Sequence, residues 1–343
     1  MIKTVKIVSL SSGLIGEEFV KHQLKIGVER LEAMGLKVKF SAHALKGIEY
    51  LDQHPEDRAA DLLEAYSDPE ADMILCAIGG EDTYRLLPYL FEEDKLKKVI
   101  NDKVFLGFSD TTVNHFMLHK LGVKGFYGQA FLPDLCEMEN DMLPYTGKYF
   151  EELIRTCAIR EIRPSDVWYK ERTCFDESQV GVPRVRRENG GFELLQGSPV
   201  FSGEILGGCI ESIYDMFGSE VHEESVRLCR QYQVFPSKDD WRGRILLLET
   251  SEETPTPEYF EKMLLAFKEY GIFDEVSGVL FGKPMDEIYA KEYQELLVKV
   301  IDDPDLPVMC NLNIGHSAPR CIIPFGVPAK VDAEGQVITF KIV

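Results

Sequence analysis

The chain has 343 residues, of which 45% are hydrophobic, and its formal net charge is −20 at pH 7. At roughly 150 residues per domain this length predicts two domains, and the apolar content is sufficient for ordinary hydrophobic cores. The sequence contains no basic stripe that could neutralise phosphates, and the negative charge argues in the same direction. We therefore expect no nucleic-acid polymer among the partners of this protein.

The chain also lacks the signs of a membrane or secreted protein. Its longest apolar runs, at 104–108 and 245–248, are far shorter than the roughly 20 residues that span a bilayer. The N-terminus has neither a sustained apolar segment nor a cleavage site, so we interpret it as a first strand. Eight cysteines are scattered without a CxxC pair, which is typical of the reducing cytosol. The sequence predicts a cytoplasmic protein that does not bind membranes.

Residues 1–160 alternate between strand-like and helix-like segments. The hydrophobic pattern predicts strands at 5–10, 36–43, 71–80, 103–108 and 124–131, and helices at 19–34, 55–66, 81–90 and 111–121. This βαβα order predicts a parallel sheet that is covered by helices and has right-handed crossovers. Ligands of such sheets bind beyond the carboxyl ends of the strands.

The pattern breaks between residues 161 and 191, a charged stretch with two prolines and a double glycine. We interpret this stretch as the connection between an N-terminal domain (1–160) and a C-terminal domain (192–343). The second domain begins with a strand-turn-strand pattern at 192–208. It continues with strands at 243–249, 276–282 and 307–316, helices at 257–271 and 290–302, and a hairpin that turns at 332–335.

Ser109 is the first candidate for chemistry. It follows an apolar strand in the sequence Gly107-Phe108-Ser109-Asp110-Thr111 and precedes an amphipathic helix. A serine at a tight strand-to-helix turn presents its hydroxyl at the edge of the sheet, where the next amide can donate to an oxyanion. The segment lacks the second glycine of G-x-S-x-G. The alternative is that Ser109 or Asp110 caps the helix.

Three further positions could cooperate with such a serine. Gly79 and Gly80 end a strand before a helix, and their free amides suit an oxyanion hole or a phosphate site equally, with a plain tight turn as the alternative. Glu249 ends the apolar run RILLLE, where a carboxylate is costly unless it is paired. The acids that follow, Glu252 and Glu253, are expected to be solvated.

His316 lies in the segment Asn-Ile-Gly-His. A lone histidine on a loop is usually structural. The order Ser109, Glu249, His316 nevertheless repeats the nucleophile–acid–base order of one class of catalytic triad, although triads are defined by geometry and not by order.

Other reactive residue types fit less well. His115 and His119 share a helix face, but no third ligand is visible, so we expect neither a metal nor another cofactor. Cys76 and Cys209 lie beside glycines in apolar runs and are interpreted as core residues. Trp168, in the connection, is either a core residue or a flat platform on which a ring could stack.

In several stretches the chain resembles the LD-carboxypeptidase family of serine peptidases, and within it the branch of the microcin C self-immunity peptidases. The stretches are AIGGEDTYRLLPYL, FLGFSDTTVNHFMLHKLGVKGFYGQAF, EILGGCIESIYDMFG, GRILLLETSEETPTPEYFEKML and IGHSAPRCIIPFGVPAKVD. The resemblance implies that Ser109 is the nucleophile, Glu249 the acid and His316 the base. It also implies that the amides of Gly80 and Asp110 form the oxyanion hole.

The resemblance carries further expectations about fold, assembly and substrate. It implies a parallel α/β domain similar to class I glutamine amidotransferases, a mixed, barrel-like C-terminal domain, and a homodimer. The expected substrate is a small peptide or a peptidyl- or aminoacyl-nucleotide conjugate, contacted by Gly79, Glu81 and Trp168. Phe175 is the alternative to Trp168 for stacking on a nucleobase.

Two alternatives stay open. LD-carboxypeptidases often carry an Arg-Gly-Gly-Tyr-Gly loop, whereas residues 78–82 here read Ile-Gly-Gly-Glu-Asp, closer to the self-immunity branch. A muropeptide LD-carboxypeptidase that releases terminal D-alanine from cell-wall tetrapeptides is therefore the second reading. The third is a non-catalytic protein on the same scaffold that holds a small anion at Gly79 and Gly80.

Overall fold

The computed structural model describes residues 1–341. The N-terminal half forms most of a six-stranded sheet with the order β14-β5-β4-β3-β1-β2. Five of its strands are parallel: β1 (Thr4–Val8), β2 (Lys37–Phe40), β3 (Met73–Cys76), β4 (Val104–Gly107) and β5 (Gly125–Tyr127). The predicted parallel strands are confirmed. Each is shorter than its apolar run because the chain leaves the sheet early to form the loops at its carboxyl edge.

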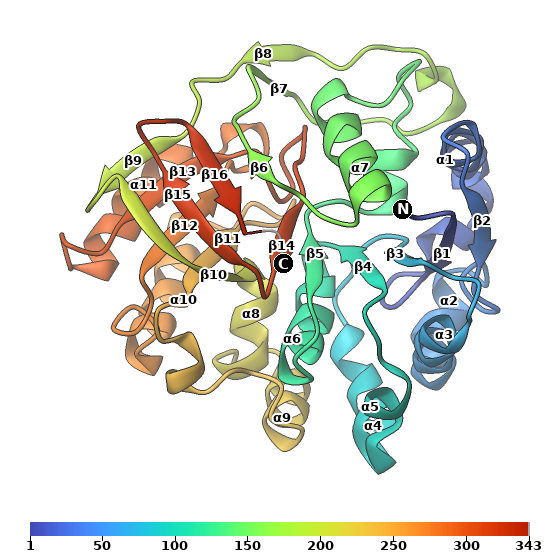
Figure 1. Ribbon diagram of the computed structural model, residues 1–343, viewed down its shortest axis with the longest axis horizontal. Coiled ribbons are helices and arrows are strands. Elements are labelled where there is room, and N and C mark those ends of the chain that lie inside the picture. Colours follow the sequence, from blue (N-terminus) through green and yellow to red (C-terminus); the bar gives the residue numbers. More distant parts are fainter. Residues whose placement is uncertain (342–343) are drawn as a thin grey trace.

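The sixth strand, β14 (Ile323–Phe325), comes from the far end of the chain and pairs antiparallel with β5. Figure 1 shows this red strand beside the green β5. The sequence analysis predicted a parallel sheet from residues 1–160 and did not foresee this antiparallel strand at its edge. The spacing of hydrophobic residues shows which residues are buried, but it does not show with which distant segment a strand pairs. Here β5 and β14 are separated by about 200 residues of chain. The pairing fastens the segment after His316 to the N-terminal sheet.

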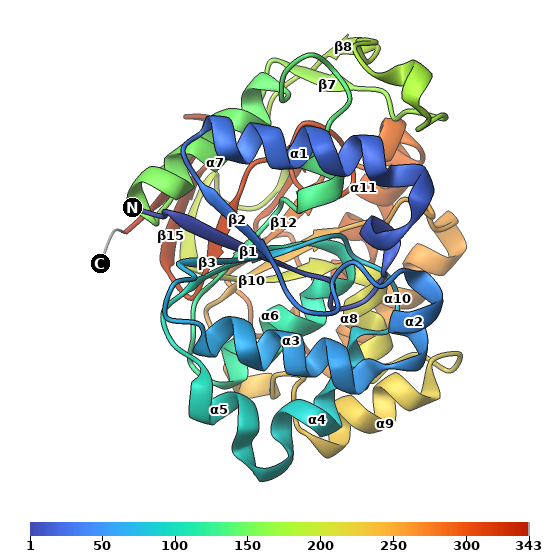
Figure 2. The same cartoon turned by 90° about the vertical axis from the view of Figure 1, so that its right-hand side faces the viewer.

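Helices cover both faces of the N-terminal sheet. In Figure 2, α1 lies over one face and α3 over the other. The helices of this half are α1 (Lys21–Ala33), α2 (Ile48–Gln53), α3 (Pro55–Ser67), α4 (Leu87–Phe91), α5 (Lys95–Val99), α6 (Thr112–Lys120) and α7 (Pro144–Thr156). The single helix predicted at 81–90 is instead a 3-10 turn (Thr83–Leu86) followed by α4. Pro88 explains the break, because it has no amide hydrogen to continue a helix from the preceding turn.

The C-terminal half forms an eight-stranded mixed sheet with the order β6-β16-β15-β10-β11-β12-β13-β9. Its centre is parallel, from β10 to β13, and its flanks are antiparallel. The strands are β6 (Glu161–Ile162), β9 (Glu193–Gln196), β10 (Val200–Cys209), β11 (Ile245–Glu249), β12 (Gly278–Gly282), β13 (Val308–Leu312), β15 (Pro328–Asp332) and β16 (Val337–Phe340). The predicted hairpin near the C-terminus is confirmed as β15–β16.

The helices α8 (Ile210–Phe217), α9 (Glu223–Gln231), α10 (Pro257–Tyr270) and α11 (Ala290–Ile301) belong to the C-terminal half. The predicted fold class, a parallel α/β domain followed by a mixed-sheet domain, is confirmed. Between residues 1 and 341, no helix combines the length and the apolar character that crossing a bilayer requires.

The stretch from 161 to 191 is anchored to both halves. β6 joins the C-terminal sheet, while β7 (Val167–Tyr169) and β8 (Arg186–Glu188) form a separate two-stranded ribbon at the top of Figure 1. Arg172 and Arg184 form ion pairs of 2.9 and 2.6 Å with Glu137 of the N-terminal half. Because these three side chains are almost completely buried, the pairs would be costly to break singly.

The two parallel regions meet at the carboxyl ends of their strands. The Tyr127 hydroxyl, at the end of β5, donates to Glu249 at the end of β11 over 2.6 Å. Close by, the Cys209 amide at the end of β10 donates to Thr112 Oγ1 at the start of α6 over 3.1 Å. This junction is where an open parallel sheet offers its ligand site.

Candidate active site

Ser109 occupies the turn between β4 and α6 with a φ of +64°. This left-handed conformation is uncommon for a residue other than glycine and stores strain. The hydroxyl of Thr112 donates to the Ser109 carbonyl over 2.6 Å and holds the turn. A Cβ atom at Gly79 would lie 2.6 Å from Ser109 Oγ, so only glycine permits this approach of the two loops.

The structure brings the three predicted triad residues into one hydrogen-bonded series. His316 Nε2 lies 3.1 Å from Ser109 Oγ, and His316 Nδ1 lies 2.8 Å from Glu249 Oε2. Glu249 is fully buried and His316 is 7% exposed. A nucleophile, a base and a carboxylate that orients the base are the parts that activate a serine hydroxyl.

Glu249 is held in place from two further sides. Gly315, with a φ of +83°, passes so close to the carboxylate that a Cβ atom there would collide with Glu249 Oε2. The Tyr127 hydroxyl donates to Glu249 Oε1 over 2.6 Å and accepts from the Ser109 amide over 3.2 Å. Burial, together with the charge of Glu249, raises the pKa of Tyr127 well above its usual range. Tyr127 is therefore a hydrogen-bond donor throughout the neutral range, which suits a partner of a buried carboxylate.

Arg320 fixes the backbone of His316. Its Nη2 donates to the His316 carbonyl over 2.8 Å, and its Nη1 pairs with Asp134 over 3.0 Å. The guanidinium also lies 4.8 Å from the centre of the Phe108 ring, which packs edge-on against the imidazole of His316. Because Asp134 belongs to the N-terminal half, this chain of contacts ties the base to the turn that carries the serine.

Sequence analysis did not find Tyr127 or Arg320. Tyr127 carried one usable signal, since it lies in a predicted strand (124–131) that follows the strand leading to Ser109. Arg320 stands among apolar residues shortly after His316 and is 4% exposed, and a buried arginine calls for a carboxylate partner.

Gly80 and Asp110 are the residues whose amides the resemblance assigns to the oxyanion hole. Both residues line the same cavity as Ser109. The Asp110 side chain accepts a 2.9 Å hydrogen bond from the Thr83 amide, and burial raises its pKa to about 6. Neither Ser109 nor Asp110 caps α6 with its side chain, so the geometry does not favour the capping alternative. The Asp110 amide, at the start of a short 3-10 helix, has no partner within that helix.

The cavity in front of Ser109 has a volume of about 510 Å³, which is within the usual range for small-molecule sites. Gly80 and Glu81 line it, together with residues of α8 and of the loop 251–256. Trp168 does not line it: the ring is 7% exposed and lies 5.4 Å from the Lys283 ammonium. Phe175 is 48% exposed and lies outside the lining as well. Stacking of a nucleobase on either ring stays a prediction.

Glu252 takes an unforeseen position. Its Oε2 lies 3.0 Å from His316 Nε2, the nitrogen that also faces Ser109. The side chain is 64% exposed, as the sequence analysis expected of a solvated residue. The contact with His316 was not expected. Burial lowers the pKa of His316, but the carboxylates of Glu249 and Glu252 outweigh it and raise the pKa to about 10. The hydrogen bond to His316 lowers the pKa of Glu252 to about 2.

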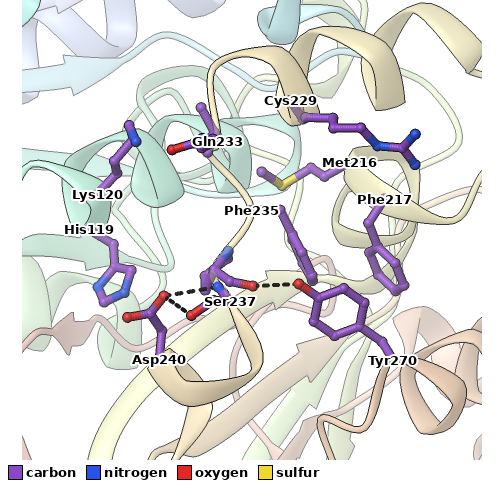
Figure 3. Close-up of a pocket in the computed structure, with 13 residues that line it drawn as sticks. His119, Lys120, Met216, Phe217, Cys229, Gln233, Phe235, Ser237, Asp240 and Tyr270 are labelled. Carbon is purple, nitrogen blue, oxygen red and sulfur yellow. Dashed lines mark hydrogen bonds between the residues drawn. The ribbon is translucent and has the colours of Figure 1, made fainter.

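A second pocket, of about 670 Å³, lies between the end of α6, α8, α9 and the segment 233–240. Figure 3 shows its rings and polar groups, including the bonds of Ser237 to Asp240. Neither Ser109 nor His316 lines this pocket, so its larger volume does not make it the candidate active site.

The remaining candidates have no visible role in the chemistry. His119 lies in the second pocket, and His115 is buried with Nε2 3.1 Å from the Gly107 carbonyl. Among residues 1–341, no three His, Cys, Asp or Glu side chains are arranged so that they could hold a metal ion together. Burial raises the pKa of the thiols of Cys76 and Cys209 above their usual range, so both are poor nucleophiles.

Comparison with known proteins gives a consistent picture. Residues 5–128 match the model of the LD-carboxypeptidase N-terminal domain, and residues 202–331 match that of the LD-carboxypeptidase C-terminal domain. The chain is 25% identical to the microcin C7 self-immunity protein MccF of Escherichia coli, over 93% of this chain and 88% of that protein. It is 24% identical to a probable murein peptide carboxypeptidase of Bacillus subtilis, with 91% and 84% covered.

Among solved structures, an MccF-like protein from Streptococcus pneumoniae in complex with AMP is 58% identical to this chain. The match covers 99% of both chains, with a TM-score of 0.98.

We expect the variant Tyr127→Phe to fold and to lose hydrolytic kcat/KM by roughly tenfold. Without the hydroxyl, a buried oxygen of Glu249 and the Ser109 amide both lose their partner, and an unmet buried group costs about 1–3 kcal/mol. Steady-state kinetics check this prediction, with thermal unfolding as the control for folding. Tyr66→Phe is the matched control, because that buried hydroxyl has no hydrogen-bond partner among the residues that the structure describes. Equal kcat/KM for Tyr127→Phe and wild type would contradict the role given to Tyr127.

We expect Glu252→Gln to shift the pH dependence of kcat/KM to lower pH. A histidine accepts a proton only when neutral, so a pKa raised to about 10 makes activity rise with pH up to that region. Removing the Glu252 charge removes one cause of the raised pKa, and kcat/KM at pH 7 should increase by several-fold, since each pKa unit is worth about tenfold in the neutral form. A pH–rate profile with an unchanged or upward-shifted midpoint would contradict the contact.

Proposed function

Since the chain belongs to the LD-carboxypeptidase family of serine peptidases, we propose that it hydrolyses the amide-type bond of peptidyl- or aminoacyl-nucleotide conjugates, with Ser109 as its nucleophile. The observation that carries this proposal is the hydrogen-bonded series from Ser109 through His316 to Glu249. The substrate class is supported by the 58% identical MccF-like protein, whose solved structure is a complex with AMP.

In the first half of the reaction, His316 takes the proton of Ser109 as the hydroxyl attacks the carbonyl carbon of the acyl group. Glu249 keeps the Nδ1 proton of His316 in place and stabilises the imidazolium that forms. Glu252 must release Nε2 before this step, because an Nε2–H that donates to the carboxylate has no lone pair left to accept the proton of Ser109.

The carbonyl oxygen becomes negative in the tetrahedral intermediate. The amides of Gly80 and Asp110 donate to it, and each such donor is worth about 3–4 kcal/mol in comparable sites. His316 then gives its proton to the leaving nitrogen, the C–N bond breaks, and an ester remains on Ser109. Water, activated by His316, hydrolyses this ester and regenerates the free hydroxyl.

The biological reading of this chemistry is self-immunity or detoxification, in which a toxic aminoacyl-nucleotide of the microcin C type is cleaved. The second candidate is the release of terminal D-alanine from a cell-wall tetrapeptide. The likeness to the probable murein peptide carboxypeptidase of Bacillus subtilis supports it, but at 24% identity it carries less weight than the 58% identical AMP-bound relative.

We expect Ser109→Ala to fold normally and to lose activity by a factor on the order of a millionfold, as in well-studied triads. His316→Ala should lose activity to a similar degree, because removing either member disables the same step. Circular dichroism and thermal unfolding monitor folding, and Ser202→Ala, an exposed serine outside the cavity, is the matched control. A fully active Ser109→Ala enzyme would refute the nucleophile assignment and with it the mechanism.

The substrate class is tested by two assays on the wild-type protein, read by mass spectrometry. One uses alanyl-sulfamoyl-adenosine and the other the tetrapeptide L-Ala-D-Glu-meso-diaminopimelyl-D-Ala. We expect release of alanine from the first substrate with a kcat/KM at least about a hundredfold higher than release of D-alanine from the second. The reverse order would replace the proposed substrate by the muropeptide.

A further inference from the structure

The cavity around Ser109 is lined by carboxylates from four separate segments. They come from the loop after β3, the turn after β4, helix α8 and the loop after β11: Glu81, Asp110, Glu211, Asp215, Glu252 and Glu253. The lining contains no lysine or arginine, and His222 is the one lining side chain that can carry a positive charge. We treat this cavity as the substrate site because Ser109, the proposed nucleophile, lines it. The acidic walls decide which molecules can enter.

Most of these carboxylates form no ion pair with any residue that the structure describes. Glu81 and Glu253 form no ion pair within residues 1–341, and the one ion pair of Glu252 there is with His316. Elsewhere in the chain comparable acids are paired, as Glu137 is with Arg172 and Arg184. The negative charge in front of the nucleophile is therefore largely uncompensated.

Asp215 and Glu211, both on α8, are also poorly balanced by positive charge. Asp215 Oδ2 lies 3.7 Å from His222, while its Oδ1 is buried and has no hydrogen-bond partner in the described part of the chain. Burial and the charge of Glu81 raise the pKa of Asp215, and burial and the charge of Glu249 raise the pKa of Glu211. A buried carboxylate beside another negative charge is stabilised in its ionised form by a cation that enters next to it.

A concave surface lined by one sign of charge focuses the electric field inside it. Such a cavity attracts a cation and repels an anion, and the repulsion contributes to specificity as much as the attraction does. The acyl group is the part of the substrate that this field acts on most directly, because Ser109 attacks the acyl carbonyl and Glu252 lies within hydrogen-bonding distance of His316.

From this arrangement we infer that the protein selects substrates whose acyl group is basic, such as a lysyl group, and discriminates against acidic acyl groups, with Glu252 and Glu253 as the selecting residues. The inference rests on the proposed function and names its substrate more closely. It also links recognition to catalysis. A substrate cation gives Glu252 a new partner, so that binding the correct acyl group frees His316 to act on Ser109.

Binding is measured first, on the Ser109→Ala variant, so that turnover does not interfere. The ligands are lysyl-, norleucyl- and glutamyl-sulfamoyl-adenosine, which differ mainly in the charge of the side chain, and the method is titration calorimetry. We expect the lysyl compound to bind roughly tenfold more tightly than the glutamyl compound, with the norleucyl compound between them. The difference should shrink as salt is added.

Side-chain variants then locate the selectivity. In the Ser109→Ala background, Glu252→Gln and Glu253→Gln should each reduce the lysyl-to-glutamyl affinity ratio by about two- to fivefold. Glu269→Gln, an exposed acid of α10 outside the cavity, changes the net charge equally and should leave the ratio unchanged. Use of a ratio cancels any effect that is common to all ligands. Glutamyl binding as tight as lysyl binding, or a ratio that neither cavity variant changes, would overturn the inference.

Turnover of the same compounds by the wild-type protein separates the two proposals. If the lysyl compound binds more tightly but none is hydrolysed, the charge preference stands and the proposed hydrolysis fails. If the compounds are hydrolysed with the glutamyl one fastest, the hydrolysis stands and the charge preference fails. Failure of all three to bind would overturn both.

Discussion

The buried carboxylate of Glu249 is the constraint on which the rest of the site depends. A fully buried charge is costly unless hydrogen bonds and an opposite charge compensate it. Here His316 supplies one bond and Tyr127 the other. Because Tyr127 belongs to the N-terminal sheet and also contacts the Ser109 amide, satisfying Glu249 fixes the distance between the serine turn and the histidine loop. The polar network thereby sets the position of one half of the molecule against the other.

The backbone around this carboxylate is shaped to fit it. Ser109 adopts a left-handed conformation, and Gly79 and Gly315 pass where a side chain would collide with Ser109 Oγ and Glu249 Oε2 respectively. The left-handed conformation of Ser109 costs about 1–3 kcal/mol and persists only where the surroundings enforce it. The packed strands β4 and β11, buried along their whole length, provide that enforcement. In return, the reacting groups are held in place before any substrate arrives, which is the main source of rate in hydrolases of this type.

Much of this architecture could be read from the sequence. The apolar runs located the central strands, and the polar residues at their carboxyl ends, Ser109 after β4 and Glu249 at the end of β11, were the places to look for a ligand site. Their roles in the reaction remain proposals. What the pattern could not supply was pairing between remote segments. The antiparallel strand β14, the bond from Tyr127 to Glu249 and the pair of Arg320 with Asp134 each join residues more than 100 positions apart. Periodicity reports which face of an element is buried, but not against what. The contact of Glu252 with His316 was not predicted for a related reason. In a sequence, an exposed acidic residue in a turn gives no sign of whether an imidazole lies beside it.

The central claim is that Ser109 becomes covalently acylated during the reaction. The most direct measurement is an acid quench of the wild-type enzyme within the first turnover of an aminoacyl-sulfamoyl-adenosine, followed by intact-mass and peptide analysis. The account predicts a transient mass increase equal to the acyl group on the peptide that contains Ser109, and its absence in His316→Ala. Turnover in which the acyl mass appears on another residue, such as Cys209, would contradict the account.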